Sequence, residues 1–164
     1  MEVVLSKVFV PDDMVLGEIG SGWQQVTSEL AYERSGPDRW LSTFPVLREW
    51  LRERPAVSDE EAAVLGRLAA RARAIRHLSL SVARLLDAGA APAVEAALVK
   101  EVGTRFEQDL VEALRDAAET ELDQGSGSLF RSLLAEAVLT SPSYTLRGGT
   151  TEVLRSVAAR GLAA

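Results

Sequence analysis

The sequence predicts an all-α protein: an up-down four-helix bundle plus a short C-terminal helix, preceded by a short N-terminal β segment. Its 164 residues suit one domain that is large enough to bury a hydrophobic core. Apolar residues make up 47% of the chain and aromatic residues only 5%, which favours helix-on-helix packing over a β-sandwich. Apolar residues also recur at helical spacing in long segments with short connections, as is typical of such a bundle.

Residues 2–10 are predicted to form a short strand, because they are apolar, rich in β-branched side chains and followed by Pro11. The rest of the chain offers no convincing partner strand, and a lone strand is not stable. We therefore expect this strand to belong to a sheet that the sequence does not contain. The glycine-rich segment 17–22 then forms a turn into the helical part.

Helical periodicity begins at Trp23, is interrupted by Gly36 and Pro37, resumes at Trp40 and stops before Pro55. The remaining helices are expected over four ranges: about 58–86, 92–122, 128–140 and 150–160. The first of these four opens with a capping box formed by Ser58 and Glu61.

Most of the other conspicuous side chains have a structural interpretation. The arginines of the 58–86 helix are expected to form a solvated face, and Lys100 is expected to be a surface or interface lysine. The single histidine, His77, is expected to be packed or exposed rather than catalytic. Three aromatic residues are assigned to the core or to an interface: Trp40, Phe44 and Trp50.

Composition also excludes several functions. The net charge of −6 argues against a general nucleic-acid-binding surface. The absence of cysteine excludes disulfides, thiolate metal sites and a cysteine nucleophile, and one histidine cannot make a multi-histidine metal centre, so no metal is expected. No apolar stretch is long enough to span a bilayer, and residues 1–5 lack the pattern of a signal peptide, so a cytoplasmic protein is expected.

The run from Thr145 to Arg155 combines two adjacent glycines, two threonines and a glutamate before an apolar-periodic helix. Free N–H groups and the positive end of the dipole at a helix N-terminus favour an anion, and two hydroxyls lie within reach. The sequence alone leaves two interpretations open. The run is either a flexible turn with Thr150 as the N-cap, or a loop that faces a phosphate or a cofactor.

The segment 29–37 carries two carboxylates, Glu29 and Glu33, one helical turn apart. Pro37 cannot donate the hydrogen bond owed to the carbonyl of Glu33, so a helix that continued through it would kink there. A carboxylate at such a kink, near apolar side chains, is a candidate general base. The alternative is a solvated structural pair of Glu33 and Arg34.

Three segments, in this order, resemble the acyl-CoA dehydrogenase family. Residues 8–23, with Pro11, Gly17, Gly20 and Gly22-Trp23, resemble the end of the family's middle β-domain and its entry into the C-terminal helical domain. Residues 30–34 resemble the Glu-Arg segment of the first long helix of that domain. Residues 146–155 resemble its closing Gly-Thr-(Ser/Thr)-Glu segment. The resemblance divides the chain into 1–20, a remnant of the middle β-domain with a linker, and 21–164, the C-terminal helical bundle domain.

The resemblance implies α,β-dehydrogenation of an acyl-CoA thioester, in which a carboxylate removes the α-proton and FAD accepts the β-hydride. In many members the base is a glutamate immediately before the final Gly-Thr, a position occupied here by Gly148. In another branch the base lies on the first long helix, and Glu33 occupies that position. The resemblance therefore implies Glu33 as the base. It also implies that Gly149, Thr150 and Glu152 hold the adenosine end of FAD.

Two family motifs are missing, the Arg-x-x-Phe-Gly and Gln-x-x-Gly-Gly-x-Gly segments, and family members are about twice as long. We therefore expect a fragment or the product of a split gene that has no turnover alone. It would form a homo- or hetero-oligomer with a chain that supplies the N-terminal and β-domains. The alternative is a non-catalytic assembly subunit of the same fold that pairs with an active partner, and a third is a helical bundle unrelated to flavin.

Overall fold

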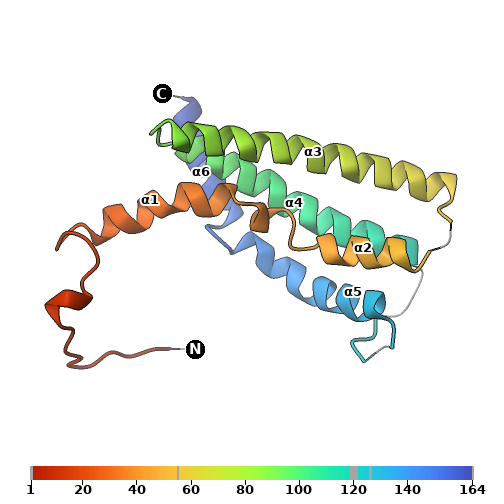
Figure 1. The fold of residues 1–164 in the computed structure, drawn as a ribbon, viewed down its shortest axis with the longest axis horizontal. Helices are drawn as coiled ribbons and strands as arrows, with labels where there is room; N and C mark the ends of the chain where they lie inside the picture. Colours follow the sequence, from red (N-terminus) through yellow and green to blue (C-terminus); the bar gives the residue numbers. More distant parts are fainter. Residues whose placement is uncertain (1, 55, 119–121, 126, 164) are drawn as a thin grey trace.

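The computed structural model describes residues 2–54, 56–118, 122–125 and 127–163, and in these ranges it is helical without a strand (Figure 1). The α-helices are α1 (Gly22–Ser35), α2 (Phe44–Arg52), α3 (Asp59–Asp87), α4 (Ala93–Ala118), α5 (Leu129–Thr140) and α6 (Thr151–Leu162). The described residues also form three short 3-10 helices: η1 (Asp12–Met14) before α1, η2 (Pro37–Arg39) between α1 and α2, and η3 (Ser141–Thr145) between α5 and α6. The all-α prediction is confirmed, and within the described residues no helix is long and apolar enough to cross a membrane.

The β segment expected at residues 2–10 is not formed. The segment has no helical or strand structure and is exposed along its length, with Phe9 at 85%. In Figure 1 it lies below the helices, separate from them. The physical reason is the one that the sequence indicates: a strand needs a partner, and the described part of the chain supplies none.

The bundle is built around α4. In Figure 1, α1 and α2 run from left to right, α3 runs back to the left, α4 runs to the right and α5 runs to the left, and α6 crosses behind the N-terminal half of α4. Helix α4 packs against α1, α2, α3, α5 and α6, which explains why eleven of its residues are buried. The hydrophobic core contains apolar side chains of α4 together with Trp40 and Trp50, whereas Phe44 is half-exposed.

Helix α1 ends at Ser35 instead of kinking. Gly36 is extended (φ −64°, ψ 156°), and Pro37 then opens η2, a position that suits its fixed φ. The Ser79 hydroxyl of α3 donates to the Ser35 carbonyl at 2.6 Å, which ties this end of α1 to the bundle. The break turns the chain so that η2 lies beside the last turn of α1.

Two predicted capping features are present. Ser58 and Glu61 form both bonds of a capping box at the start of α3, with Ser58 N donating to Glu61 Oε2 at 2.8 Å and Glu61 N donating to Ser58 Oγ at 3.2 Å. Thr150 is the N-cap of α6, and its hydroxyl accepts from Val153 N at 3.4 Å. The four predicted helical ranges match α3, α4, α5 and α6 closely, although residues 119–121 at the expected end of α4 lie outside the described residues.

Candidate functional site

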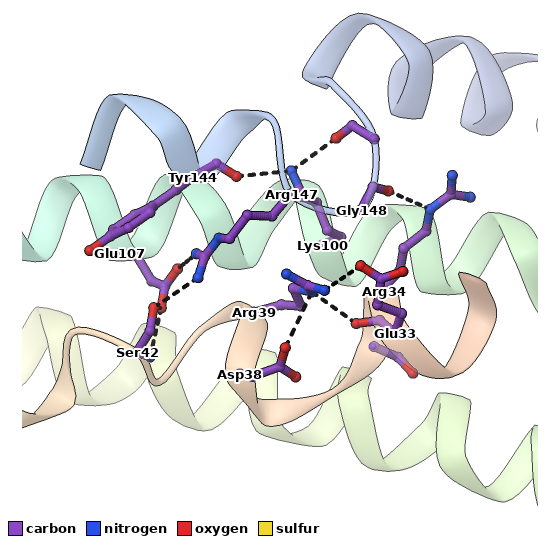
Figure 2. A network of polar contacts seen from close by, with 12 residues as sticks. Glu33, Arg34, Asp38, Arg39, Ser42, Lys100, Glu107, Tyr144, Arg147 and Gly148 are labelled. Carbon is purple, nitrogen blue, oxygen red and sulfur yellow. Dashed lines mark hydrogen bonds and ion pairs between the residues drawn. The ribbon is translucent and has the colours of Figure 1, made fainter. Parts of the chain in front are cut away.

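The end of α1, the short η2 helix and the loop before α6 meet over the middle of α4 (Figure 2). They bring together residues that are far apart in sequence, Glu33 and Arg34 from α1 and the pair Gly148 and Gly149 from the loop. The site is therefore built by tertiary packing, with α4 as its floor.

Glu33 faces the glycine loop. A Cβ atom built on Gly148 would lie 3.3 Å from Glu33 Oε1 and 3.8 Å from its Cδ. The Glu33 side chain is 43% exposed, so the carboxylate is accessible from outside this chain. A carboxylate that lies against an open loop position and remains accessible can reach a bound molecule.

Arg39 fixes the orientation of Glu33. Its Nη2 donates to Glu33 Oε1, and its Nε donates to the Glu33 backbone carbonyl at 3.0 Å. That carbonyl needs a partner because Pro37, four residues later, has no N–H to offer. Arg39 also pairs with Asp38 at 3.4 Å and is itself buried. Arg39 was not predicted from the sequence, although Pro37 indicates an unpaired carbonyl at Glu33.

Arg34 holds the loop from the other side. Its Nε donates to the Gly148 carbonyl at 2.8 Å, and burial lowers its pKa against the opposing charge of Glu33. Gly148 and Gly149 have φ values of +65° and +110°, in the left-handed region that favours glycine. The chain thus turns sharply at the point nearest Glu33, with no side chain in between.

The expectation that Lys100 is a surface or interface lysine is wrong. It is fully buried in α4, and its ammonium donates to the carbonyl oxygens of Tyr144, Thr145 and Gly149 at 3.2, 3.4 and 3.1 Å. The apolar neighbours of Lys100 in the sequence gave no sign of these acceptors, because the acceptors are 44 to 49 residues away.

A second polar network lies next to the loop (Figure 2). The fully buried Glu107 of α4 accepts from Arg147 Nη2 at 2.5 Å and from Ser42 N at 2.7 Å. The Arg147 guanidinium also stacks 4.3 Å from the centroid of the Tyr144 ring. This network fixes Arg147, and thereby the chain just before Gly148, and the sequence gave no signal for it.

The start of α6 suits a ligand rich in hydrogen-bond donors. The backbone N–H of Glu152, and then the Thr150 hydroxyl, hold the pKa of the Glu152 carboxylate below its usual value. The carboxylate is therefore ionised, and it lies at the helix N-terminus. A carboxylate there accepts hydrogen bonds from ribose hydroxyls or an amino group and repels a phosphate. Thr150 and Glu152 thus place a hydroxyl and an ionised carboxylate at the start of α6, where they could bind hydrogen-bond donors of a ligand. Among the described residues, no group of three or more acidic or histidine side chains could hold a metal ion.

The fold and the site together describe a helical-bundle domain in which a loop of two glycines closes on a carboxylate. Residues 20–163 match the family model described as "Acyl-CoA dehydrogenase, C-terminal domain". The chain is 31% identical over 166 residues to the protein "Acyl-CoA dehydrogenase FadE34" of Mycobacterium tuberculosis (strain ATCC 25618 / H37Rv), an alignment that covers 98% of this chain. The chain therefore belongs to the acyl-CoA dehydrogenase family, as a C-terminal domain of that family.

The chain spans 22% of the length of this relative. No solved structure matches it.

Proposed function

We propose that this chain acts as the C-terminal domain of a FAD-dependent acyl-CoA dehydrogenase and supplies the catalytic base, Glu33. The observation that carries the proposal is the approach of Gly148 to Glu33. In the family, the base stands either on the first long helix or immediately before the final Gly-Thr. In this chain, a Cβ atom at Gly148 would lie 3.3 Å from Glu33 Oε1, so a base on either position would lie in the same part of the site.

In the proposed reaction, the Glu33 carboxylate accepts the α-proton of an acyl-CoA thioester, and the electrons of the broken Cα–H bond form the new double bond. FAD, when bound, supplies the acceptor for the hydride that leaves the β-carbon. Arg39 keeps the carboxylate oriented through Oε1, which leaves Oε2 to take the proton. The loop itself places no side chain against the carboxylate at positions 148 and 149, because both are glycine.

The start of α6 is the part of this chain that we assign to the cofactor. Thr150 and Glu152 would accept hydrogen bonds from the adenosine end of FAD, and Gly149, with no side chain, would allow the ligand to approach the backbone. The ionised state of Glu152 supports this assignment. The flavin ring and much of the acyl-CoA would be held by domains that the described residues do not contain, supplied within an oligomer.

The test uses the enzyme assembled with its N-terminal and β-domains, loaded with FAD, and measures dye reduction that depends on acyl-CoA. Glu33→Gln should lower kcat by about 10²–10⁴-fold, the usual contribution of a general base. The matched control is Glu29→Gln, which changes an exposed carboxylate one turn earlier on the same helix and should leave kcat unchanged.

Flavin absorbance must be retained in both variants, which shows that the loss is chemical. An active, yellow complex that tolerates Glu33→Gln would place the base on another chain. It would leave this chain the alternative role of a non-catalytic assembly subunit.

A further inference from the structure

Lys100 is a cation placed inside the bundle beneath the glycine loop. Lys100 is 0% exposed, and Nζ donates to the carbonyl oxygens of Tyr144, Thr145 and Gly149. Figure 2 shows the contact with Tyr144. An ammonium group has three protons and no acceptor capacity, so three carbonyls match its donors. These carbonyls stand at the two ends of the loop that contains Gly148.

The surroundings of Lys100 are electrostatically unfavourable for its charge. Burial lowers the pKa of Lys100, followed by the positive charge of Arg147, and Glu101 alone among the contributing charges opposes this. Two more guanidiniums lower it further, those of Arg39 on η2 and Arg34 on α1. A buried charge among like charges is weak evidence for a net gain in stability, which directs attention to the loop carbonyls that Lys100 binds.

The element that Lys100 holds is the Tyr144–Gly149 loop, which lies next to Glu33. Lys100 fastens the loop at both ends, and Arg34 binds the carbonyl of Gly148 between them at 2.8 Å. Backbone with φ values of +65° and +110° has few contacts of its own to keep it there, because glycine has no side chain. Without the ammonium, three buried or partly buried carbonyls would lose their partner.

We propose that Lys100 is a positioning residue that fixes the Tyr144–Gly149 loop against Glu33, acting through the loop carbonyls and never on the substrate. The inference rests on the proposed role of Glu33 for its catalytic meaning, although the anchoring of the loop can be tested without it.

The first experiment measures amide hydrogen exchange in the 164-residue chain for the wild type and two variants. Lys100→Met removes the donors while keeping a long apolar stem, and we expect exchange in residues 145–151 to rise at least about tenfold, as the loss of hydrogen bonds from a charged donor requires. The matched control is Thr104→Val, one turn later on α4. Thr104 is equally buried, and its hydroxyl has no hydrogen-bond partner among the described residues. It should leave loop exchange unchanged.

Unchanged exchange in residues 145–151 of a folded Lys100→Met chain overturns the proposal. If Lys100→Met does not fold, the same exchange measurement is made on Lys100→Gln, whose amide keeps two donors without the charge. A rise confined to the loop supports the proposal, and an equal rise in the loop and in the core of α3 overturns it.

The second experiment uses the assembled, flavin-loaded enzyme. Lys100→Met should lower kcat by about 10–100-fold through misplacement of the loop, with KM for the acyl-CoA changed by no more than about twofold. Lys100→Arg, which keeps the charge and the donors, should recover part of kcat. If Glu33→Gln does not lower kcat, the catalytic role of the anchored loop is overturned, but the anchoring itself is not. Amide exchange tests the anchoring, and activity tests the catalytic role.

Discussion

Arg39 binds Glu33 twice, through the backbone carbonyl at 3.0 Å and through the carboxylate. The first bond replaces the one that Pro37 cannot supply, and the second orients the proposed base. One guanidinium thus binds both the carbonyl at the helix end and the carboxylate of the proposed base. Because both bonds come from the same buried residue, the carboxylate cannot turn away from the loop without releasing the arginine.

Replacing Arg39 should therefore lower the stability of the fold. Arg39→Met leaves the Glu33 carbonyl without its partner, and we expect the free energy of unfolding to fall by about 1–2 kcal/mol. This is the low end for charged hydrogen bonds because the Glu33 side chain is 43% exposed. Urea denaturation measures the change, with Arg76→Met, an exposed arginine of α3, as the control. An equal change in the two variants would show that the Arg39 bonds contribute nothing.

The convergence of Gly148 and Glu33 predicts that the base can be moved. In the assembled enzyme, the double variant Glu33→Gln with Gly148→Glu should regain part of the dye reduction lost in Glu33→Gln, because the new side chain starts 3.3 Å from the old carboxylate oxygen. A non-glycine residue at φ +65° costs about 1–2 kcal/mol, so the double variant should also be less stable. Gly148→Gln in the same background carries the same strain without a carboxylate. Recovery in that variant too would contradict the prediction.

The elements with local causes were predictable from the sequence. Ser58 and Glu61 predict the start of α3 because both capping partners lie within one turn, and Pro37 predicts the end of α1. The strand at residues 2–10 could not be predicted from its own pattern, because a strand depends on a partner. Lys100 could not be placed either, since its acceptors lie 44–49 residues further on. Glu33 and Gly148 were linked only through the family resemblance, because no local pattern joins residues on two different elements.

The close approach of α4 to η2 depends on Gly103. A Cβ there would lie 2.7 Å from the Arg39 carbonyl oxygen and 3.1 Å from Trp40 Cβ, so either α4 or the segment that carries Arg39 must shift. Gly103→Ala should lower the free energy of unfolding by about 1–3 kcal/mol, as overpacking does. Gly66→Ala in α3 is the matched control, since a Cβ there meets nothing within 4 Å. The control should gain about 0.5–1 kcal/mol from helix propensity, and equal signs for the two variants would refute the steric argument.

The capping box of α3 predicts a specific acid sensitivity. The Ser58 backbone N–H first, and then the charge of Arg54, hold the pKa of Glu61 below its ordinary value. The folded state therefore binds fewer protons than the unfolded state between the lowered pKa and the ordinary one near 4.5. The stabilising contribution is complete above that window and is lost as the pH falls through the folded-state pKa.

Glu61→Gln keeps the capping geometry but cannot titrate, so its urea midpoint should fall less than that of the wild type between about pH 5 and pH 3. Glu60→Gln, the same change at the adjacent exposed position, should follow the wild type, and identical acid profiles for Glu61→Gln and Glu60→Gln would remove the capping box as the cause.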